Sequence, residues 1–302
     1  MRPAALDLPV PAQEAEQRAW AGRKRFADVG GLDFAYVEIA GSEPPLLLVH
    51  GFTDTSRSFS LLAPHLSGRR LVMPDLRGHG ASQAGRGFGI ADFADDVAGL
   101  IRRLRLERPV VVGHSLGGAV ALALAIEHPT AISGIALLAP LTHLEARARQ
   151  KFDLLYVPSR LWRRVLARTV AIPVSLKYAE PTMKFIFSPQ AVPGDYMIVG
   201  GGWLGLRPAH FHATSTDFVA VEEDLGRLEQ RYGEIVMPAG ILFGADDRVI
   251  GIAAHGDPMP GRIKQLDFER VQGLGHMPQF VEPERVVAFI QRVAERAFAG
   301  IT

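Results

Sequence analysis

The stretch VVVGHSLGG, residues 110–118, decides the fold of this chain. Its three consecutive valines are typical of a short strand buried on both faces of a sheet, and the small residues that follow are typical of a closely packed helix. Between them, GHSLG at residues 113–117 has the pattern G-x-S-x-G, which forms a strained turn from strand to helix and exposes the serine hydroxyl. A helix N-terminus at this point would also stabilise a developing oxyanion. We therefore predict that Ser115 is a nucleophile; the alternative is a serine that only caps the helix.

Apolar runs similar to residues 110–112 recur along the chain. They occupy residues 46–49, 71–73, 135–138 and 241–243. Helical patterns occupy residues 90–104, 118–127 and 283–299. Strands that alternate with helices indicate βαβ crossovers, so the sequence predicts an α/β fold with a mostly parallel sheet and helices on both of its faces.

The segment before the first of these runs has a different pattern. Extended runs at residues 25–29 and 32–40 flank the pair Gly30 and Gly31, which predicts a β-hairpin. Residues 12–22 have the pattern of a short helix that precedes the domain.

The alternation of strands and helices also stops in the second half of the chain. The stretch from residue 141 to 234 is rich in aromatic residues, contains several Pro and Gly, and is too long for a connection within a compact domain. We interpret residues 141–234 as an inserted helical cap. Residues 1–140 and 235–302 would then form the core domain.

A serine nucleophile needs a base, and two histidines, His255 and His276, follow the last junction between an apolar strand and an acid. Where a G-x-S-x-G turn carries the nucleophile, the order along the chain is serine, acid, histidine. His255 precedes the next strand candidate at residues 264–271, whereas His276 follows it in the glycine-flanked loop GLGHMP. Because an open α/β sheet places its site at the carboxyl ends of the strands, we predict that His276 is the general base.

The acid that orients this histidine is expected in ILFGADD, residues 241–247. Asp246 and Asp247 are adjacent in this segment. One of them should face the histidine, and the other should cap a turn or meet solvent. The spacing alone leaves both open.

The segment HGFTD, residues 50–54, follows the first strand of the predicted parallel sheet. A loop in this place supplies one N–H of an oxyanion hole, and the residue after the nucleophile supplies the other. We therefore predict the backbone N–H groups of Phe52 and Leu116 as donors, provided that Ser115 is the nucleophile. Each donor would contribute roughly 3–4 kcal/mol to stabilisation of the transition state. We interpret DLRGHGAS, residues 75–82, as a structural loop, since its histidine precedes the serine.

Together these motifs resemble the α/β-hydrolase superfamily, in the branch with a helical cap after the sixth strand. The resemblance extends from about residue 25 to residue 299. It implies that the acid is the third residue after Gly244, which is Asp247 rather than Asp246, and it supports Phe52 as an oxyanion donor.

The residues around the nucleophile also differ between members of this branch. Epoxide hydrolases and haloalkane dehalogenases have Asp where this chain has Ser115. Carbon–carbon bond hydrolases typically have Asn before the serine and Trp after the histidine, and here those places hold His114 and Met277. The sequence therefore looks more like the esterase and lipase members.

Bulk properties exclude several classes of function. The 302-residue chain has a net charge of +1, which gives no reason to expect nucleic-acid binding, and its lack of cysteine excludes thiolate nucleophiles, disulfides and Cys-ligated zinc. No motif implies a metal or an organic cofactor.

The N-terminus lacks the apolar segment of a secretory signal, and the apolar stretch at residues 196–206 is too short to span a bilayer. We expect a cytoplasmic protein without a transmembrane segment and leave open whether it forms a homo-oligomer.

The predicted cap is rich in aromatic residues and is basic in its first half. We expect most of its aromatic side chains to form the cap's own core and some to line an apolar acyl pocket. Residues 141–184 contain nine Lys and Arg residues against three acids. Such charge usually marks a solvated helix face; the alternative is attraction to an anionic substrate or a membrane surface.

The sequence thus predicts a serine hydrolase that cleaves small, fairly apolar carboxylic esters through an acyl-enzyme on Ser115. The alternatives are a carbon–carbon bond or lactone hydrolase with the same triad, a cofactor-free perhydrolase, and a ligand-binding member of the fold that hydrolyses slowly or not at all. The complete set of Ser115, Asp247 and His276 argues against an inactive fold.

Overall fold

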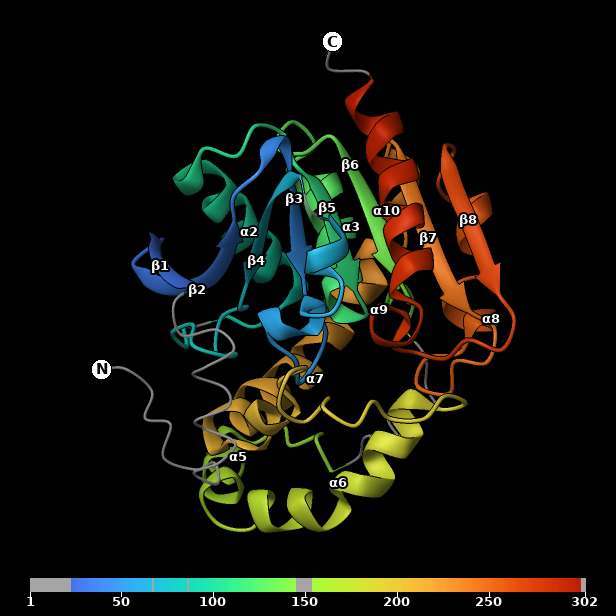
Figure 1. The fold of residues 1–302 in the computed structure, drawn as a ribbon. Helices are drawn as coiled ribbons and strands as arrows, with labels where there is room; N and C mark the ends of the chain where they lie inside the picture. Colours follow the sequence, from blue (N-terminus) through green and yellow to red (C-terminus); the bar gives the residue numbers. More distant parts are fainter. Residues whose placement is uncertain (1–22, 67, 86, 145–153, 300–302) are drawn as a thin grey trace.

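The structure is a computed structural model and describes residues 23–299 except 67, 86 and 145–153. The helix predicted at residues 12–22 lies outside the described residues. A single sheet of eight strands, in the order β1-β2-β4-β3-β5-β6-β7-β8, crosses the molecule (Figure 1). The strands are β1 (Lys24–Val29), β2 (Leu32–Ile39), β3 (Ser42–Val49), β4 (Arg69–Pro74), β5 (Val110–His114), β6 (Gly134–Leu138), β7 (Ala239–Gly244) and β8 (Leu266–Val271).

Strand pairing confirms the predicted α/β fold class. β1 and β2 form an antiparallel hairpin in which Val29 faces Leu32 across the Gly30-Gly31 turn, and β2 is also antiparallel to β4. From β4 to β8 every neighbouring pair is parallel. The sheet is therefore mostly parallel with an antiparallel edge.

Helices cover both faces of this sheet. The helices that follow core strands are α2 (Ile90–Leu104), α3 (Leu116–Glu127), α8 (Ile252–His255), α9 (Pro278–Val281) and α10 (Pro283–Phe298), and the short 3₁₀ segments are η1 (Ser56–Phe59), η2 (Ala63–Leu66), η4 (Tyr232–Glu234) and η5 (Met259–Gly261). Successive strand residues point to opposite faces. Leu47 and Val111 belong to the hydrophobic core that contains α2 and α3, whereas Leu46 and Val112 belong to the core that contains α10.

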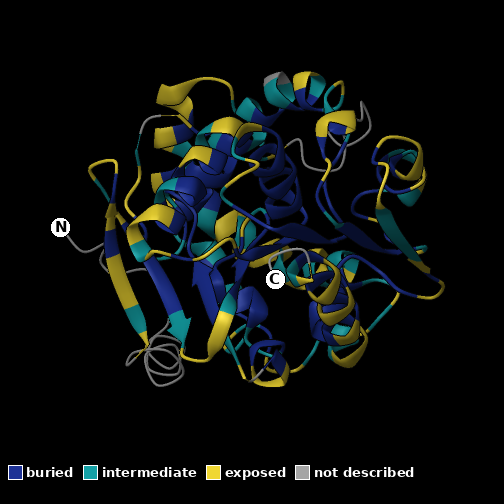
Figure 2. Cartoon of the chain, turned by 90° about the horizontal axis from the view of Figure 1, so that it is seen from above, coloured by how far each residue is buried: buried dark blue, intermediate teal, exposed yellow. Residues whose placement is uncertain are grey.

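Burial explains why the central strands are apolar throughout. In Figure 2 the strands in the middle of the sheet are buried, and the exposed residues lie on the outer strand and the outward faces of the helices. Every residue of α3 except Glu127 is buried. Its glycines and alanines let this helix lie close to the sheet, which places its N-terminus directly beside the carboxyl ends of the strands.

The segment between β6 and β7 contains the predicted cap. Its elements are α5 (Arg160–Arg168), α6 (Ala171–Phe187), η3 (Gly202–Leu206), α7 (Pro208–Leu228) and the short η4 (Tyr232–Glu234). We call the described residues 154–234 the cap segment. It lies beyond the carboxyl ends of the parallel strands, at the bottom of Figure 1. The cap helix α7 contacts the core, since its Phe218 ring lies 5.9 Å from that of Phe52 in the loop after β3.

A buried contact between two titratable side chains also joins α7 to the core. His79 Nε2 lies 3.2 Å from Asp217 Oδ2, and neither side chain has exposed surface. Burial lowers the pKa of His79 to about 3, with a further contribution from His50, and burial raises the pKa of Asp217 well above its usual value. Both shifts favour the neutral form of the group, as burial away from water does for any titratable side chain.

The close contact between α3 and the sheet gives a test of the fold. A Cβ atom at Gly117 would lie 2.1 Å from the carbonyl oxygen of Val49, a backbone atom that cannot move aside without displacing β3. We expect Gly117→Ala to lower the free energy of unfolding by at least about 1–3 kcal/mol in urea denaturation. Gly226→Ala is the matched control because Gly226 lies within α7 with no atom near its missing Cβ. That substitution should stabilise the protein by about 0.5–1 kcal/mol; equal effects of the two variants would contradict this packing.

Candidate functional site

Ser115 occupies a strained turn between β5 and α3. Its backbone has φ 52° and ψ −115°, in the region of positive φ that non-glycine residues rarely adopt. Such strain costs about 1–3 kcal/mol and persists only where the surrounding structure holds it. Here the Ser115 N–H donates to the Leu138 carbonyl at 3.1 Å, and the Ser115 carbonyl accepts from the N–H groups of Gly118 at 2.9 Å and Leu141 at 3.0 Å. The turn is therefore fixed by the neighbouring strand and by the helix that follows.

Glycines bring the surrounding segments close to this turn. A Cβ at Gly113 would lie 2.3 Å from the Gly117 carbonyl oxygen, and a Cβ at Gly51 would lie 3.0 Å from the Ser115 Cβ. The loop after β3 therefore lies against the serine, as the sequence predicts for an oxyanion loop.

The structure brings His276 and Asp247 together. His276 Nδ1 lies 2.7 Å from Asp247 Oδ2, and both residues are buried. The other carboxylate oxygen of Asp247 accepts the N–H groups of Val249 at 2.8 Å and Ile250 at 3.0 Å, which fixes its orientation. Since Nδ1 donates to the carboxylate, the lone pair of the neutral imidazole is on Nε2, the nitrogen that a general base uses.

The two adjacent acids have different partners. Asp246 directs its Oδ2 to the N–H of Gly273 at 2.7 Å, in the loop after β8, and does not meet the imidazole. Asp247 therefore contacts the imidazole of His276, whereas Asp246 bonds to the backbone of the loop after β8.

The candidate oxyanion donors lie beside the serine. Leu116 is the first residue of α3, and Phe52 follows Gly51 in the loop that contacts Ser115. Within the described residues, neither backbone N–H donates to another group of the protein. Two backbone donors without an acceptor are what an oxyanion hole requires before its ligand is bound.

His50 holds the loop after β3 in place. Its Nε2 accepts the N–H of Leu76 at 2.9 Å, so its Nδ1 carries the hydrogen and donates to the Gly51 carbonyl at 2.9 Å. Burial lowers the pKa of His50, which keeps the ring neutral and preserves this pair of bonds.

His114 joins the serine turn to the histidine loop, a role that the sequence analysis missed. Its Nε2 donates to the His276 carbonyl at 2.9 Å, and the two rings lie 5.0 Å apart. Burial, and then the neighbouring His276, lower the pKa of His114 to about 3, so it is a neutral donor at pH 7. Position 114 precedes the nucleophile, but no spacing in the sequence indicates that its ring reaches a loop 162 residues away.

Gln190, which follows α6, also contacts this loop and was not found from the sequence. Its Oε1 accepts the N–H of Gly275 at 3.1 Å, and its Nε2 donates to the Gly273 carbonyl. One side-chain amide from the cap segment thus bonds to two peptide groups just before His276. A lone glutamine in an irregular segment carries no sequence signal for such a contact.

The remaining histidines considered in the sequence analysis have structural contacts. His255 is buried, and its Nδ1 accepts the N–H groups of Thr142 at 3.2 Å and His143 at 3.3 Å. His79 contacts Asp217 in α7, as described above. Neither residue is part of the group around Ser115.

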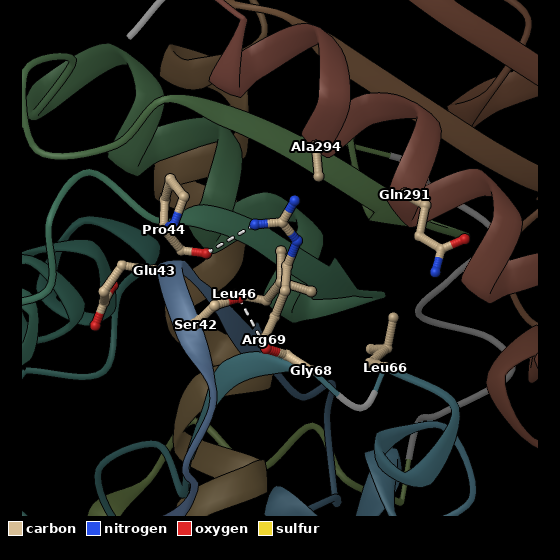
Figure 3. Close-up of a pocket in the computed structure, with 9 residues that line it drawn as sticks. All are labelled: Ser42, Glu43, Pro44, Leu46, Leu66, Gly68, Arg69, Gln291 and Ala294. Carbon is tan, nitrogen blue, oxygen red and sulfur yellow. Dashed lines mark hydrogen bonds between the residues drawn. The ribbon is translucent and has the colours of Figure 1, made fainter. Parts of the chain in front are cut away.

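Three further features bear on the kind of site. The described residues contain no group of three or more His, Cys, Asp or Glu side chains arranged to hold a metal ion. Among them, no helix combines the length and the apolar composition needed to cross a membrane. A cavity lined by Ser42, Arg69 and Gln291 lies at the amino ends of β3 and β4 (Figure 3), the opposite end of the strands from Ser115, and we do not assign it to the site.

The different partners of the two acids predict different effects of their substitution. Asp247→Asn leaves an uncharged group beside His276 and favours the wrong imidazole tautomer, so we expect kcat for hydrolysis to fall by about 10⁴-fold. Asp246→Asn keeps an oxygen that can accept the Gly273 N–H and should retain most of the activity. Steady-state kinetics of the two purified variants measure the difference; similar losses would show that the acid is wrongly assigned.

The contacts of Gln190 predict a role in positioning His276. We expect Gln190→Ala to lower kcat roughly tenfold to a hundredfold with little change in KM, because a small displacement of a catalytic group is costly. Gln190→Glu keeps an acceptor for the Gly275 N–H and should recover part of the loss. Gln291→Ala, on the exposed side of α10, is the control. An unchanged kcat for Gln190→Ala would exclude this role.

Comparison with known sequences shows relatives that are hydrolases. Residues 44–192 match the family model described as alpha/beta hydrolase fold. The putative carbamate hydrolase RutD of Pantoea ananatis is 35% identical over 235 residues, which cover 74% of this chain and 77% of that protein. The magnesium-chelatase 30 kDa subunit of Rhodobacter capsulatus is 36% identical over 159 residues, 51% of this chain, and the match spans about half (53%) of that protein's length.

Solved structures show the same fold. A thermophilic esterase from Thermogutta terrifontis superimposes with a TM-score of 0.74 at 22% identity, over 91% of this chain and 99% of that one. Identity this low supports only a shared fold. The 35% identity to the putative carbamate hydrolase, over about three quarters of both chains, supports membership of the same family. With its mostly parallel eight-stranded sheet and its strained serine turn after β5, the chain belongs to the α/β-hydrolase family.

Proposed function

We propose that this protein is a serine hydrolase that acts on carboxylic esters through an acyl-enzyme on Ser115. The observation that carries the proposal is the 2.7 Å contact of His276 Nδ1 with Asp247, on a loop bonded through His114 to the turn that bears the strained serine. A serine activated by an imidazole, itself oriented by a carboxylate, is the arrangement used for acyl transfer.

In the first half of the reaction, Ser115 Oγ attacks the ester carbonyl and its proton passes to His276 Nε2. Asp247 holds the imidazole by its Nδ1–H and stabilises the imidazolium that forms. The carbonyl oxygen becomes an oxyanion that accepts hydrogen bonds from the N–H groups of Phe52 and Leu116. The intermediate collapses when the bond to the alkoxy group breaks, and the imidazolium gives its proton to the departing alkoxy oxygen, which leaves as the alcohol.

The second half repeats these steps with water. His276 takes a proton from water while the water oxygen attacks the acyl carbonyl of Ser115. The same two N–H groups bind the new oxyanion, and the proton on His276 returns to the serine oxygen as the carboxylic acid leaves. Every group required belongs to the chain, so the mechanism uses no metal or cofactor.

Aromatic side chains of the cap segment support an apolar, uncharged substrate. The Phe52 ring lies 5.9 Å from that of Phe218 on α7, which in turn lies 6.3 Å from that of Tyr156. These three rings come from the oxyanion loop, from α7 and from the irregular segment before α5. We propose that they form part of the wall that contacts the acyl group.

A second candidate keeps the same residues and changes the leaving group. The relative RutD is named a putative carbamate hydrolase and is 35% identical to this chain, so carbamates and amides are the nearest alternative class. Their leaving nitrogen must be protonated as it departs, which His276 could do in the step that protonates the alcohol. Cleavage of a carbon–carbon bond needs proton transfer to carbon as well, for which the site offers no assigned group.

Substrate comparison tests the proposal. We expect kcat/KM to be highest for p-nitrophenyl esters of short to medium acyl chain, lower for the matched carbamate, and lowest for a ring-cleavage diketone. Ser115→Ala and His276→Ala should each abolish ester hydrolysis, and His255→Ala, a buried histidine away from the serine, should retain it if the variant folds. Faster turnover of the diketone than of every ester, or substantial activity of folded Ser115→Ala, would contradict the proposal.

A further inference from the structure

The outward side of the cap segment exposes large apolar side chains. On α5, Arg163 and Ala167 point inward and are buried, and α5 packs on α7 through this side. On the opposite side, Leu161 is 67% and Trp162 61% exposed, and Val165 lies one turn further along the helix. A tryptophan and a leucine side by side in water are an unfavourable arrangement unless another apolar phase covers them.

α6 continues this exposed surface. Of its seventeen residues, only the first and the last, Ala171 and Phe187, are buried, although most of its side chains are apolar. α5 and α6 form the part of the cap segment farthest from the sheet (Figure 1). We call this the outer cap surface, and its exposed apolar residues are Leu161, Trp162, Val165, Val174, Leu176 and Tyr178.

Cations lie on the same two helices as these apolar residues. Arg160, Arg164 and Arg168 are exposed on α5, and Lys177 is exposed on α6 with its Nζ 5.6 Å from the Tyr178 ring centroid. The only acid in residues 154–187 is Glu180, which forms an ion pair with Lys184. The outer cap surface is thus apolar, aromatic and positively charged at once.

We propose that the outer cap surface binds anionic lipid bilayers. Helices that lie in a membrane interface carry Trp and Leu on the side that enters the acyl boundary, with Arg and Lys placed to meet anionic headgroups. α5 presents both kinds of side chain within three turns, and α6 lengthens the apolar area. This property goes beyond hydrolysis and does not depend on it.

The charge pattern favours a bilayer over a second copy of the chain. In a symmetric dimer through this surface, Arg160, Arg164 and Arg168 of one copy would approach the same cations of the other, with a single acid nearby to compensate. A bilayer that contains anionic lipid supplies both the apolar phase and the opposite charge.

Binding in this orientation would bring the membrane close to the candidate site. α6 ends at Phe187, and Gln190 beyond it bonds to the loop that carries His276. The Phe187 ring also packs on those of Tyr196 and Phe280, so this end of α6 is anchored to the core. An apolar substrate dissolved in the bilayer would therefore meet the protein on the side where the site lies.

Co-sedimentation with vesicles tests the proposal directly. We expect the full chain to bind vesicles of phosphatidylcholine with phosphatidylglycerol at least tenfold more tightly than vesicles of phosphatidylcholine alone, and added salt should weaken the binding. The combined variant Arg160→Gln, Arg164→Gln, Arg168→Gln should lose this preference for anionic vesicles. Its control is Arg102→Gln, Arg103→Gln, Arg105→Gln, which removes three exposed arginines at the end of α2.

The apolar part of the surface needs its own variants. Leu161→Ser with Trp162→Ser should weaken binding at least tenfold, whereas Phe26→Ser with Val236→Ser, two exposed apolar residues elsewhere, should not. In a chain with Trp20→Phe and Trp203→Phe, the fluorescence of Trp162 should shift to the blue with anionic vesicles. Circular dichroism and retained ester hydrolysis show that each variant is folded.

Several results would overturn the proposal. One is that the folded chain binds both kinds of vesicle equally, or binds neither. Another is that the α2 control variant loses as much binding as the α5 arginine variant. A dimer in solution that Leu161→Ser with Trp162→Ser converts to a monomer would assign the outer cap surface to contact between copies instead.

Discussion

The backbone strain at Ser115 is the constraint on which the rest of the site depends. A non-glycine residue at φ 52° is stable only because Leu138, Leu141 and the first turn of α3 hold its peptide groups, and because Gly113 and Gly117 leave room for the turn. The parallel sheet supplies those partners, since β5 and β6 end side by side. The same close approach brings the loop with Gly51 and Phe52 against the serine, so the fold determines where an oxyanion would be bound.

The histidine side of the site depends on contacts between distant segments. Asp247 orients the imidazole, His114 bonds to the backbone of His276, and Gln190 from the cap segment bonds to the two glycines before it. Residues of the core and of the cap segment therefore both fix the position of His276, the proposed base. The inner side of the cap segment meets the core through α7, where buried His79 and Asp217 lie together. Its outer side is the apolar and cationic surface of α5 and α6.

Sequence patterns predicted the features that depend on residues close together in the chain. Runs of valine and leucine predicted the parallel strands, the Gly30-Gly31 pair predicted the hairpin, and the glycines around Ser115 predicted the turn. Spacing along the chain could not show whether Asp246 or Asp247 contacts His276. In a loop after a strand, a shift of one residue changes which neighbouring loop the side chain faces. Gln190 and His114 could not be found, because their roles arise from hydrogen bonds across 85 and 162 residues of chain. The basic residues of 141–184 predicted a solvated helix face, but they did not indicate that Leu161 and Trp162 are exposed beside them.

The most direct measurement of the central claim is the mass of the enzyme during turnover. The chain is mixed with an activated ester, quenched in acid within the first turnovers and examined by intact-mass and peptide mass spectrometry. The account predicts one acyl group per chain, attached to the peptide that contains Ser115, with none on Ser115→Ala and far less on His276→Ala. Hydrolysis that proceeds without any such adduct in single-turnover samples, or an acyl group carried by another residue, would contradict it.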